Sequence, residues 1–134
     1  MRKTKGLFDV FDGLRVYGDE NAEVALIGIG SVTGAAVEAL DAIRSSTRRS
    51  VKFIQLRALK PFPVGAFCDT MATVDLGIAI DQNISGQLLS LIRAETGLGN
   101  LTGIQKYDGE PYRPREIVAQ VAEAFQESGV SVRA

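Results

Sequence analysis

The chain contains 134 residues, of which 46% are hydrophobic and 23% are charged, and its formal net charge is −1. These values are typical of one globular domain, and they exclude a long disordered segment and a strongly basic surface for nucleic acid or an anionic membrane. With no histidine and one cysteine, Cys68, the sequence excludes a Ser-His-Asp or Cys-His nucleophile, an imidazole metal site, a cysteine-ligated iron–sulfur cluster and an internal disulfide. We therefore expect no catalytic residue, no metal site, no nucleic-acid or membrane partner, and a reducing, cytoplasmic location.

The first predicted unit is a strand, a helix and a second strand. Residues Glu23 to Ile29 form an apolar run that is typical of a buried strand. Apolar side chains then recur on one face at helical spacing: Ala36, Val37, Leu40 and Ile43. After the polar turn "RSSTRRS", the segment Val51 to Leu56 is rich in β-branched and aromatic residues and predicts the second strand.

The second half repeats this alternation. A short helix is predicted to start near Pro63 and to run through Phe67 and Met71. A third strand, Leu76 to Ile80, leads into a helix with an apolar stripe, which Gly97 closes. The members of that stripe are Leu88, Leu89, Leu91 and Ile92.

The last predicted elements are a fourth strand, Leu101 to Lys106, a helix that begins at Pro114, and an edge strand in the tail, Val130 to Arg133. Strands separated by helices of crossover length predict an α/β fold: a three-layer, open, mainly parallel sheet with helices on both faces.

Several polar or reactive side chains have simple structural explanations. We interpret Cys68 as a small buried hydrophobic residue. The basic cluster around the Ser-rich turn is interpreted as a solvated loop: Arg44, Arg48, Arg49 and Lys52. The same interpretation applies to three carboxylates for which the sequence offers no partner base: Asp108, Glu110 and Glu116.

The glycines after the first strand allow two interpretations. Gly28, Gly30 and Gly34 form G-x-G-x-x-x-G where a strand passes into a helix, and such a turn can bring free N–H groups to a phosphate. The contacts to an anion or to coenzyme A (CoA) would then come from Gly30, Ser31, Thr33 and Gly34. However, the usual spacing is G-x-G-x-x-G, and the acidic residue expected about 20 positions later is absent. In the other interpretation, Ser31 or Thr33 caps the helix and the glycines permit close packing.

Polar residues also follow the third strand, at "DQN". Asp81 and Asn83 lie at the carboxyl edge of the predicted sheet, where ligands and partners of open α/β proteins usually bind. Both side chains can equally hydrogen-bond their own backbone in Asx-turns before the next helix. Both interpretations stay open.

Four segments together resemble a known family: "GIGSVTGAAVEAL", "LRALKPFPVGAF", "AIDQNISGQLLSLIRAETG" and "YDGEPYRPREI". They resemble, in the same order, the C-terminal domain of the α subunit of 2-oxoacid:ferredoxin oxidoreductases, nearest the 2-oxoglutarate type. The family turn G-W-G-S-T-x-G corresponds to Gly28 through Gly34. The family pattern E-x-N-x-x-G-Q-L corresponds to Asp81 through Leu88, with aspartate in place of glutamate. The resemblance implies a fold like the C-terminal domain of transketolase.

The resemblance also implies an organisation and a role. Residues 1–16 would be a lead-in segment, and residues 17–134 a single domain. The complete enzyme decarboxylates a 2-oxoacid such as pyruvate to acyl-CoA and reduces ferredoxin, using thiamine diphosphate, Mg²⁺, iron–sulfur clusters and CoA. This domain would bind no cofactor itself and would serve as a structural and interface domain that is inactive alone. The matching motif residues, as the expected interface, are Ser31, Asp81, Gln82, Asn83, Gly86 and Gln87.

The expected partners are the remaining α-subunit domains and the β subunit, with ferredoxin as an indirect partner. Two alternatives stay open. One is a stand-alone nucleotide- or CoA-binding domain that uses the Gly28–Gly34 turn. The other is a non-enzymatic module that forms a homo-oligomer through the same edge.

Overall fold

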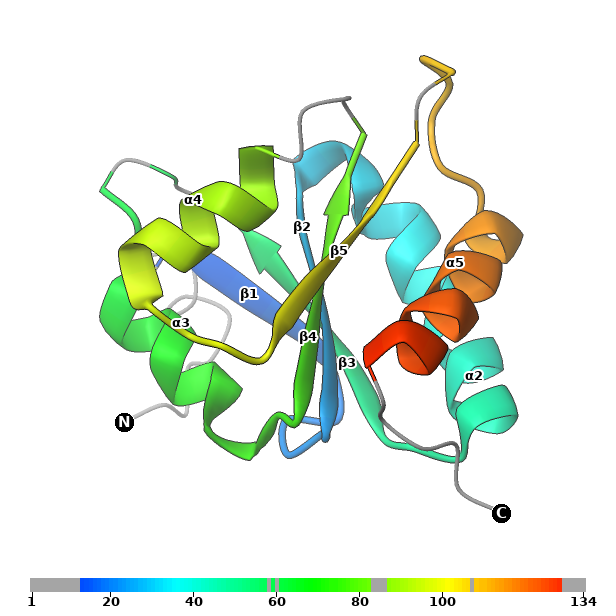
Figure 1. The fold of residues 1–134 in the computed structure, drawn as a ribbon, viewed down its shortest axis with the longest axis horizontal. Coiled ribbons are helices and arrows are strands. Elements are labelled where there is room, and N and C mark those ends of the chain that lie inside the picture. Colours follow the sequence, from blue (N-terminus) through cyan, green and yellow to red (C-terminus); the bar gives the residue numbers. More distant parts are fainter. Residues whose placement is uncertain (1–12, 58, 60, 83–86, 107, 129–134) are drawn as a thin grey trace.

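The computed structural model describes residues 13–57, 59, 61–82, 87–106 and 108–128. Strands and helices alternate along most of this part of the chain (Figure 1). The elements are β1 (Leu14–Gly18), β2 (Val24–Ile29), the 3₁₀ turn η1 (Gly30–Val32), α2 (Thr33–Thr47), β3 (Val51–Leu56), α3 (Val64–Thr70), the 3₁₀ turn η2 (Met71–Thr73), β4 (Leu76–Asp81), α4 (Gln87–Thr96), β5 (Leu101–Gln105) and α5 (Pro114–Ser128).

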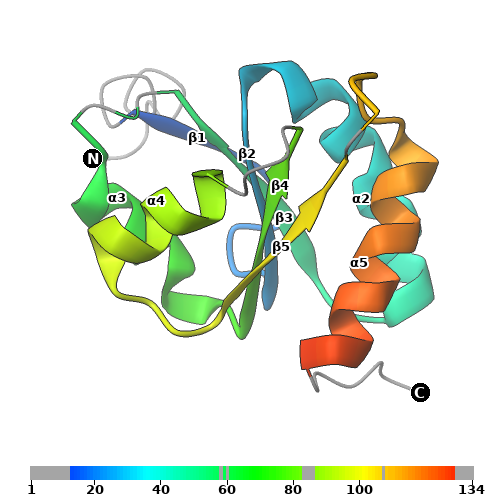
Figure 2. The same ribbon diagram turned by 45° about the horizontal axis from the view of Figure 1, so that its top comes forward.

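The strands form one sheet in the order β1-β3-β2-β4-β5. Strands β2, β3, β4 and β5 are parallel, and β1 pairs antiparallel with β3. Helices α2 and α5 cover one face, and α3 and α4 cover the other (Figures 1 and 2). The prediction of a three-layer, mainly parallel α/β fold is confirmed.

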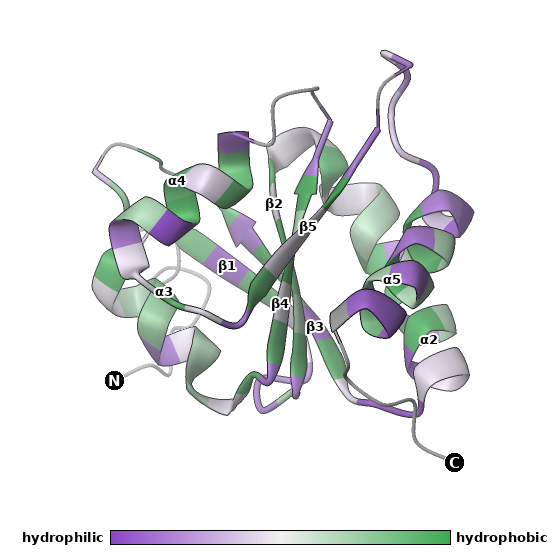
Figure 3. Ribbon diagram, in the orientation of Figure 1, coloured by the Kyte–Doolittle hydropathy of each residue, from purple (hydrophilic) through white to green (hydrophobic). Residues whose placement is uncertain are grey.

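Two hydrophobic cores, one on each face, hold the layers together. In the central strand β2, five of six residues are buried, as expected for a parallel strand covered on both sides. Phe53 of β3 packs toward α2 and α5, whereas its neighbour Ile54 packs toward α3 and α4. Figure 3 shows apolar strands at the centre and polar connections at the ends of the sheet.

Strand β1 was not predicted. Its sequence, LRVYG, is short and contains Arg15, and its pairing partner β3 is distant in sequence. The strand runs across the expected boundary between residues 16 and 17, so Leu14, which is 2% exposed, belongs to the core. The division into a lead-in segment and a domain stays a prediction. The predicted tail strand, 130–133, lies outside the described residues.

The prediction of a solvated basic cluster is wrong for two of its four members. Lys52 is 1% exposed, and its Nζ donates to the carbonyl oxygens of Glu20 (2.8 Å) and Thr70 (2.6 Å). Arg49 is also buried and forms ion pairs with Asp75 (2.5 Å) and Glu23 (3.2 Å). A buried cation needs such partners, and here they come from segments distant in sequence.

Cys68 is only half-buried, so the expectation that it is a buried hydrophobic residue is wrong in degree. It lies on α3 beside the fully buried Phe67, whose ring packs edge-on against Phe62. No helix in the described part of the chain is long and apolar enough to cross a membrane.

Candidate functional site

The sheet has a topological switch point between β2 and β4. From β2 the chain passes through α2 to β3 on one side, whereas β4 leads through α4 to β5 on the other side and over the opposite face. The carboxyl ends of β2 and β4 are therefore neighbours whose connections diverge. In open α/β folds, such a crevice is the usual place for binding. Both predicted motifs follow these two strand ends.

The glycine turn after β2 forms a 3₁₀ turn that continues directly into α2. The predicted capping by Ser31 or Thr33 is wrong, because the N-cap of α2 is Val32 and no described side chain caps the helix start. Thr33 lies inside the first turn, and its buried Oγ1 has no hydrogen-bond partner among the described residues.

The glycines of this turn differ in their surroundings. A Cβ at Gly28 would lie 2.5 Å from Val32 Cγ1 and 3.1 Å from Phe53, so close packing requires a glycine there. A Cβ at Gly30 or Gly34 would meet nothing within 4 Å, and neither residue has a positive φ. The close-packing interpretation therefore applies to Gly28, and the described part of the chain gives no steric reason for the other two.

Gln82 bridges the crevice. Its Nε2 donates to Ser31 Oγ (3.4 Å), and its Oε1 accepts a hydrogen bond from the backbone N–H of Tyr112 (3.4 Å). One amide thus links the connections that follow β2, β4 and β5. Ser31 and Gln82, both among the motif residues, lie together here, and their interface role stays a prediction. The contribution of Tyr112 was missed because only the fold brings its backbone to this edge.

Asp81 is 5% exposed, and its carboxylate Oδ1 accepts a hydrogen bond from the backbone N–H of Leu88 (3.2 Å) in the first turn of α4. Burial raises the pKa of this carboxyl above its ordinary value, and hydrogen bonds from the backbone N–H groups of Leu88 and Leu89 partly oppose the rise. Asp81 therefore supports the helix start, and Gln87 lies exposed beside it. Asn83 and Gly86, and with them the predicted Asx-turns, lie outside the described residues.

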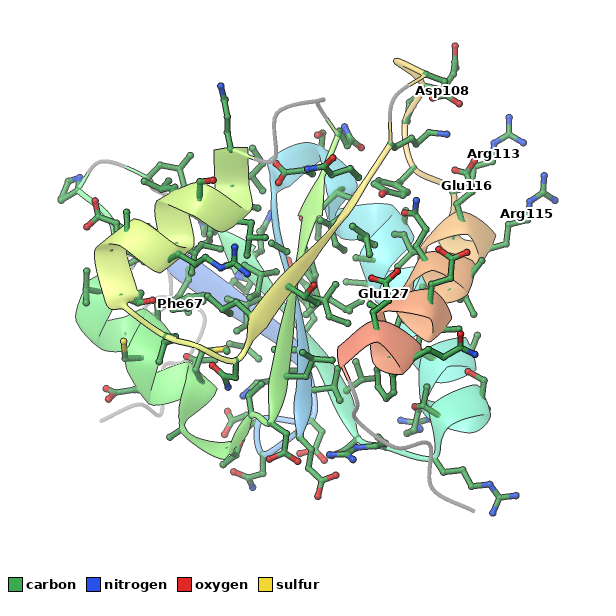
Figure 4. All side chains as sticks on the ribbon, in the orientation of Figure 1. Phe67, Asp108, Arg113, Arg115, Glu116 and Glu127 are labelled. Atoms are coloured by element: carbon green, nitrogen blue, oxygen red, sulfur yellow. The ribbon has the colours of Figure 1, made fainter. Side chains whose placement is uncertain are left out.

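Ion pairs organise the connection between β5 and α5, so the interpretation of its carboxylates as merely solvated is wrong for two of them. Lys106 Nζ contacts Asp108 (3.1 Å) and Glu116 (3.0 Å), and Figure 4 shows both carboxylates near the start of α5. Glu116 Oε1 also accepts a hydrogen bond from the backbone N–H of Arg113 (2.8 Å). The pKa of Asp108 is lowered chiefly by a hydrogen bond from the backbone N–H of Glu110 (3.0 Å) and then by Lys106. The pKa of Glu116 is lowered chiefly by the bond from Arg113 and then by Lys106, and the two carboxylates raise the pKa of Lys106. The i, i+3 spacing of Arg113 and Glu116 before an apolar run was the available signal.

The exposed side chains at the carboxyl ends of β2 and β4 are mostly uncharged. From Ile29 to Gly34 no residue is charged, and Gln82 and Gln87 add neutral amides. Among the described residues, no three His, Cys, Asp or Glu side chains gather into a group that could hold a metal ion. Large hydrophobic side chains are exposed at the end of β2, after β3 and at the start of α3: Ile29 (42%), Leu59 (39%) and Val64 (38%).

Comparison with known proteins adds an independent finding. A family model described as pyruvate:ferredoxin oxidoreductase core domain II matches residues 22–117. The chain is 35% identical over 106 residues to the alpha subunit of 2-oxoacid:ferredoxin oxidoreductase 2 of Aeropyrum pernix, and the match covers 79% of this chain. The chain spans 16% and 17% of the length of two such curated relatives.

Two solved structures share the fold. A 2-oxoglutarate:ferredoxin oxidoreductase from Magnetococcus marinus, with 2-oxoglutarate, coenzyme A and succinyl-CoA bound, aligns with a TM-score of 0.74 and 30% identity, over 90% of this chain and 21% of that one. A split-gene transketolase, solved as an inactive beta4 tetramer, aligns with a TM-score of 0.69 over 86% of this chain and 42% of that one. At 17% identity, the transketolase likeness concerns the fold alone.

Proposed function

Because the chain belongs to the family of pyruvate:ferredoxin oxidoreductase core domain II, we propose that it serves as a structural domain of the α subunit of a 2-oxoacid:ferredoxin oxidoreductase. The complete enzyme would oxidatively decarboxylate a 2-oxoacid to acyl-CoA and reduce ferredoxin. With no histidine and a single cysteine, the chain cannot ligate an iron–sulfur cluster. Among the described residues, no three carboxylate, thiol or imidazole side chains gather where they could hold a metal ion such as Mg²⁺. In this proposal, the iron–sulfur clusters, Mg²⁺, thiamine diphosphate and CoA are bound by other domains of the complete enzyme.

The observation that carries this proposal is the exposed turn after β2 at the switch point, in which no residue from Ile29 to Gly34 is charged. Ile29 is exposed there beside Gly30 and Gly34, whose missing Cβ atoms have no explanation within the described chain. Close approach of another backbone is one reason for a glycine whose φ is not positive. These features support a contact with a neighbouring polypeptide in which Ser31, Gln82 and Gln87 offer hydrogen bonds. Asn83 and Gly86 belong to the same proposed surface.

The proposed partners are the remaining α-subunit domains and the β subunit, with ferredoxin reached only through them. The domain would brace this contact and position the neighbouring catalytic domains. Because it would contribute no reacting group, we expect the isolated chain to be inactive in 2-oxoacid oxidation.

A charge at Gln87 tests the proposal. The tagged chain, purified from its native cells, is expected to bring down 2-oxoacid:ferredoxin oxidoreductase subunits and 2-oxoacid-dependent dye reduction. Gln87→Glu should weaken this association by about 2–4 kcal/mol, because an unpaired charge would be buried in the contact. Gln126→Glu, an exposed change on α5 far from the edge, is the control and should leave association unchanged. Equal copurification of both variants would argue against the proposal.

The buried, unpartnered Thr33 Oγ1 favours one alternative, a stand-alone anion site for CoA or a nucleotide at the start of α2. Thermal unfolding of the isolated chain with and without ligand decides between the two functions. Under our proposal, millimolar CoA or NADP leaves the Tm of the isolated chain unchanged, whereas a ligand that binds only the folded state would raise it.

A further inference from the structure

Strand β5 forms one edge of the sheet, and a groove runs along it beside α5. One hollow of about 210 Å³ is lined by Gly103, Ile104 and Gln105 of β5 and by residues of α5, including Glu123 and Glu127. A second hollow of about 320 Å³ is lined by the start of β5, by Asn100 and again by Glu127. Glu127 lines both, so the two hollows adjoin, and Figure 4 shows its side chain beside β5.

The backbone of β5 turns alternate peptide groups into this groove. The carbonyl of Asn100 accepts from Gly77 (2.8 Å) and the N–H of Lys106 donates to Asp81 (3.2 Å), so even-numbered residues face β4. Because peptide groups alternate along a strand, the odd-numbered residues 101, 103 and 105 face outward. Gly103, at the centre, lines the groove with its backbone, because a Cβ there would instead face Leu89 of α4 at 3.1 Å.

Two side chains cover the ends of this edge. Arg93 Nη2 donates to the carbonyl of Leu101 (3.1 Å), and Gln120 Nε2 donates to the carbonyl of Gln105 (2.9 Å). A carbonyl oxygen has two lone pairs, so the contact from Arg93 leaves the carbonyl of Leu101 able to accept a second hydrogen bond. An added strand that pairs with Leu101 and Gly103 is therefore compatible with the contact from Arg93.

The charges of the groove indicate what fits it. Gln120, Glu123, Ala124 and Glu127 form one stripe of α5 at helical spacing, and both glutamates are exposed. Strand β5 itself carries no charge. A second copy of this chain would bring its own acidic stripe to the same groove, and like charges that face each other disfavour such pairing. The complementary occupant is basic.

Topology disfavours one other occupant of the groove, a strand that follows α5 in the same chain. The connections from β3 to β4 and from β4 to β5 lead toward the β5 edge, and their helices, α3 and α4, lie on one face of the sheet. The connection from β2 to β3 leads toward the β1 edge, and its helix, α2, lies on the other face. Helix α5 lies on the α2 face. A parallel strand added beside β5 after α5 would therefore make a left-handed crossover, which occurs in only about 2% of cases.

We propose that this groove binds an extended polypeptide segment, from a neighbouring protein chain or domain, with lysine or arginine at alternate positions. The segment pairs with β5 as a sixth strand, and its basic side chains on one face reach Glu123 and Glu127. Backbone hydrogen bonds supply affinity in this mode, and the alternating side chains supply selectivity. The site lies on the β5 edge, so it does not depend on the contact proposed at the switch point.

The test is an NMR titration of the complete 134-residue chain with the synthetic peptide acetyl-KVKVKVK-amide. We expect its amide signals from Leu101, Gly103 and the α5 stripe to shift and saturate. The peptide acetyl-EVEVEVE-amide should leave them in place, and acetyl-KVKPKVK-amide should bind more weakly because proline removes a backbone donor. The double variant E123Q/E127Q should weaken binding of the basic peptide about tenfold.

Glu95→Gln is the matched control, because Glu95 is an exposed glutamate on α4 at the other face, and it should bind the basic peptide like the wild type. The proposal is overturned if the basic peptide shifts no signals, if the acidic peptide binds equally well, or if the shifts fall on other elements. Self-association of the chain through β5, detected by sedimentation, would also overturn it, because the occupant would then be a second copy.

Discussion

Burial of the Asp81 carboxyl makes the stability of the chain depend on pH in a direction that is unusual for a carboxylate. Its pKa in the folded chain is raised above the ordinary value, chiefly by desolvation. The folded state therefore binds the proton more tightly than the unfolded state. The stability that this preference contributes is fully present below the unfolded pKa and is lost as the pH rises through the folded pKa.

The variant Asp81→Asn keeps an oxygen acceptor for the N–H of Leu88 but does not titrate. We expect its free energy of unfolding, relative to the wild type, to increase as the pH rises from about 4 to 7. Urea unfolding over this pH range measures the difference. Asp108→Asn should show the opposite trend at lower pH, from about 4 downward, because Asp108 has a lowered pKa and the stability that it contributes is present above the unfolded pKa and is lost as the pH falls through the folded pKa. A difference that does not vary with pH would contradict the role of burial at Asp81.

Single side chains were also where sequence reasoning failed most. The solvated interpretation of Lys52 followed from its charge and its polar neighbours. Its amine is instead held by carbonyl groups of Glu20 and Thr70, which lie 32 and 18 residues away. The Gln82 bridge to Ser31 spans 51 residues. Local sequence carries no signal for such distant partners, although the motif did select Ser31 and Gln82.

Two glycines near the junction of β2, η1 and α2 differ in their surroundings: Gly28 is closely packed, whereas Gly34 has space around it. In Gly28→Ala, the new methyl group would lie 2.5 Å from Val32 Cγ1 and against the ring of Phe53. Both neighbours are buried in the core between the sheet and α2. Overpacking should therefore destabilise the chain by about 1–3 kcal/mol, measured by urea unfolding.

Gly34→Ala is the matched control in the same turn. A methyl group there meets nothing within 4 Å, and the residue has no positive φ. Alanine should stabilise the isolated chain by about 0.5–1 kcal/mol, because it restricts the unfolded chain and favours the helix. If both variants had the stability of the wild type, the close packing of β2 on α2 would be refuted.

Elements with a clear periodicity were predicted well. The strand Val51–Leu56 and the start of α5 at Pro114 agree with the sequence analysis, because a continuous apolar run and a proline in the first helical turn are strong local signals. Strand β1 was missed because it has five residues, an arginine, and a burial pattern that is mostly intermediate. Its pairing with β3 is what makes it a strand.

The N-terminal limit of the folded domain can be tested by truncation. A chain of residues 17–134 loses Leu14, which is 2% exposed, and three of the five residues that pair with β3. We expect it to be less stable than a chain of residues 13–134 by at least about 2 kcal/mol, from the lost burial of one leucine alone. Thermal unfolding of both chains measures the difference. Equal stability would place the boundary where the sequence analysis expected it.

The family resemblance and the α/β architecture that the four motifs implied are confirmed by the comparisons. Several motifs in a fixed order carry more information than any one of them, and the Gly28–Gly34 turn alone left two interpretations open. The interface role of the motif residues, which depends on polypeptides beyond this chain, stays a proposal.

The two ends of the sheet are tied with unequal strength. At the amino ends of the strands, Lys52 and Arg49 hold carbonyl and carboxylate groups at 2.5 to 3.2 Å, and charge-assisted hydrogen bonds are the stronger kind. At the carboxyl ends, ion pairs hold the connection from β5 to α5, but the bridge through Gln82 at the switch point consists of two neutral contacts of 3.4 Å. The turns at the switch point are therefore held by weaker contacts than the amino ends of the strands. We expect a partner that binds these turns to shift them at a small energetic cost, while the contacts at the amino ends keep the strands in register.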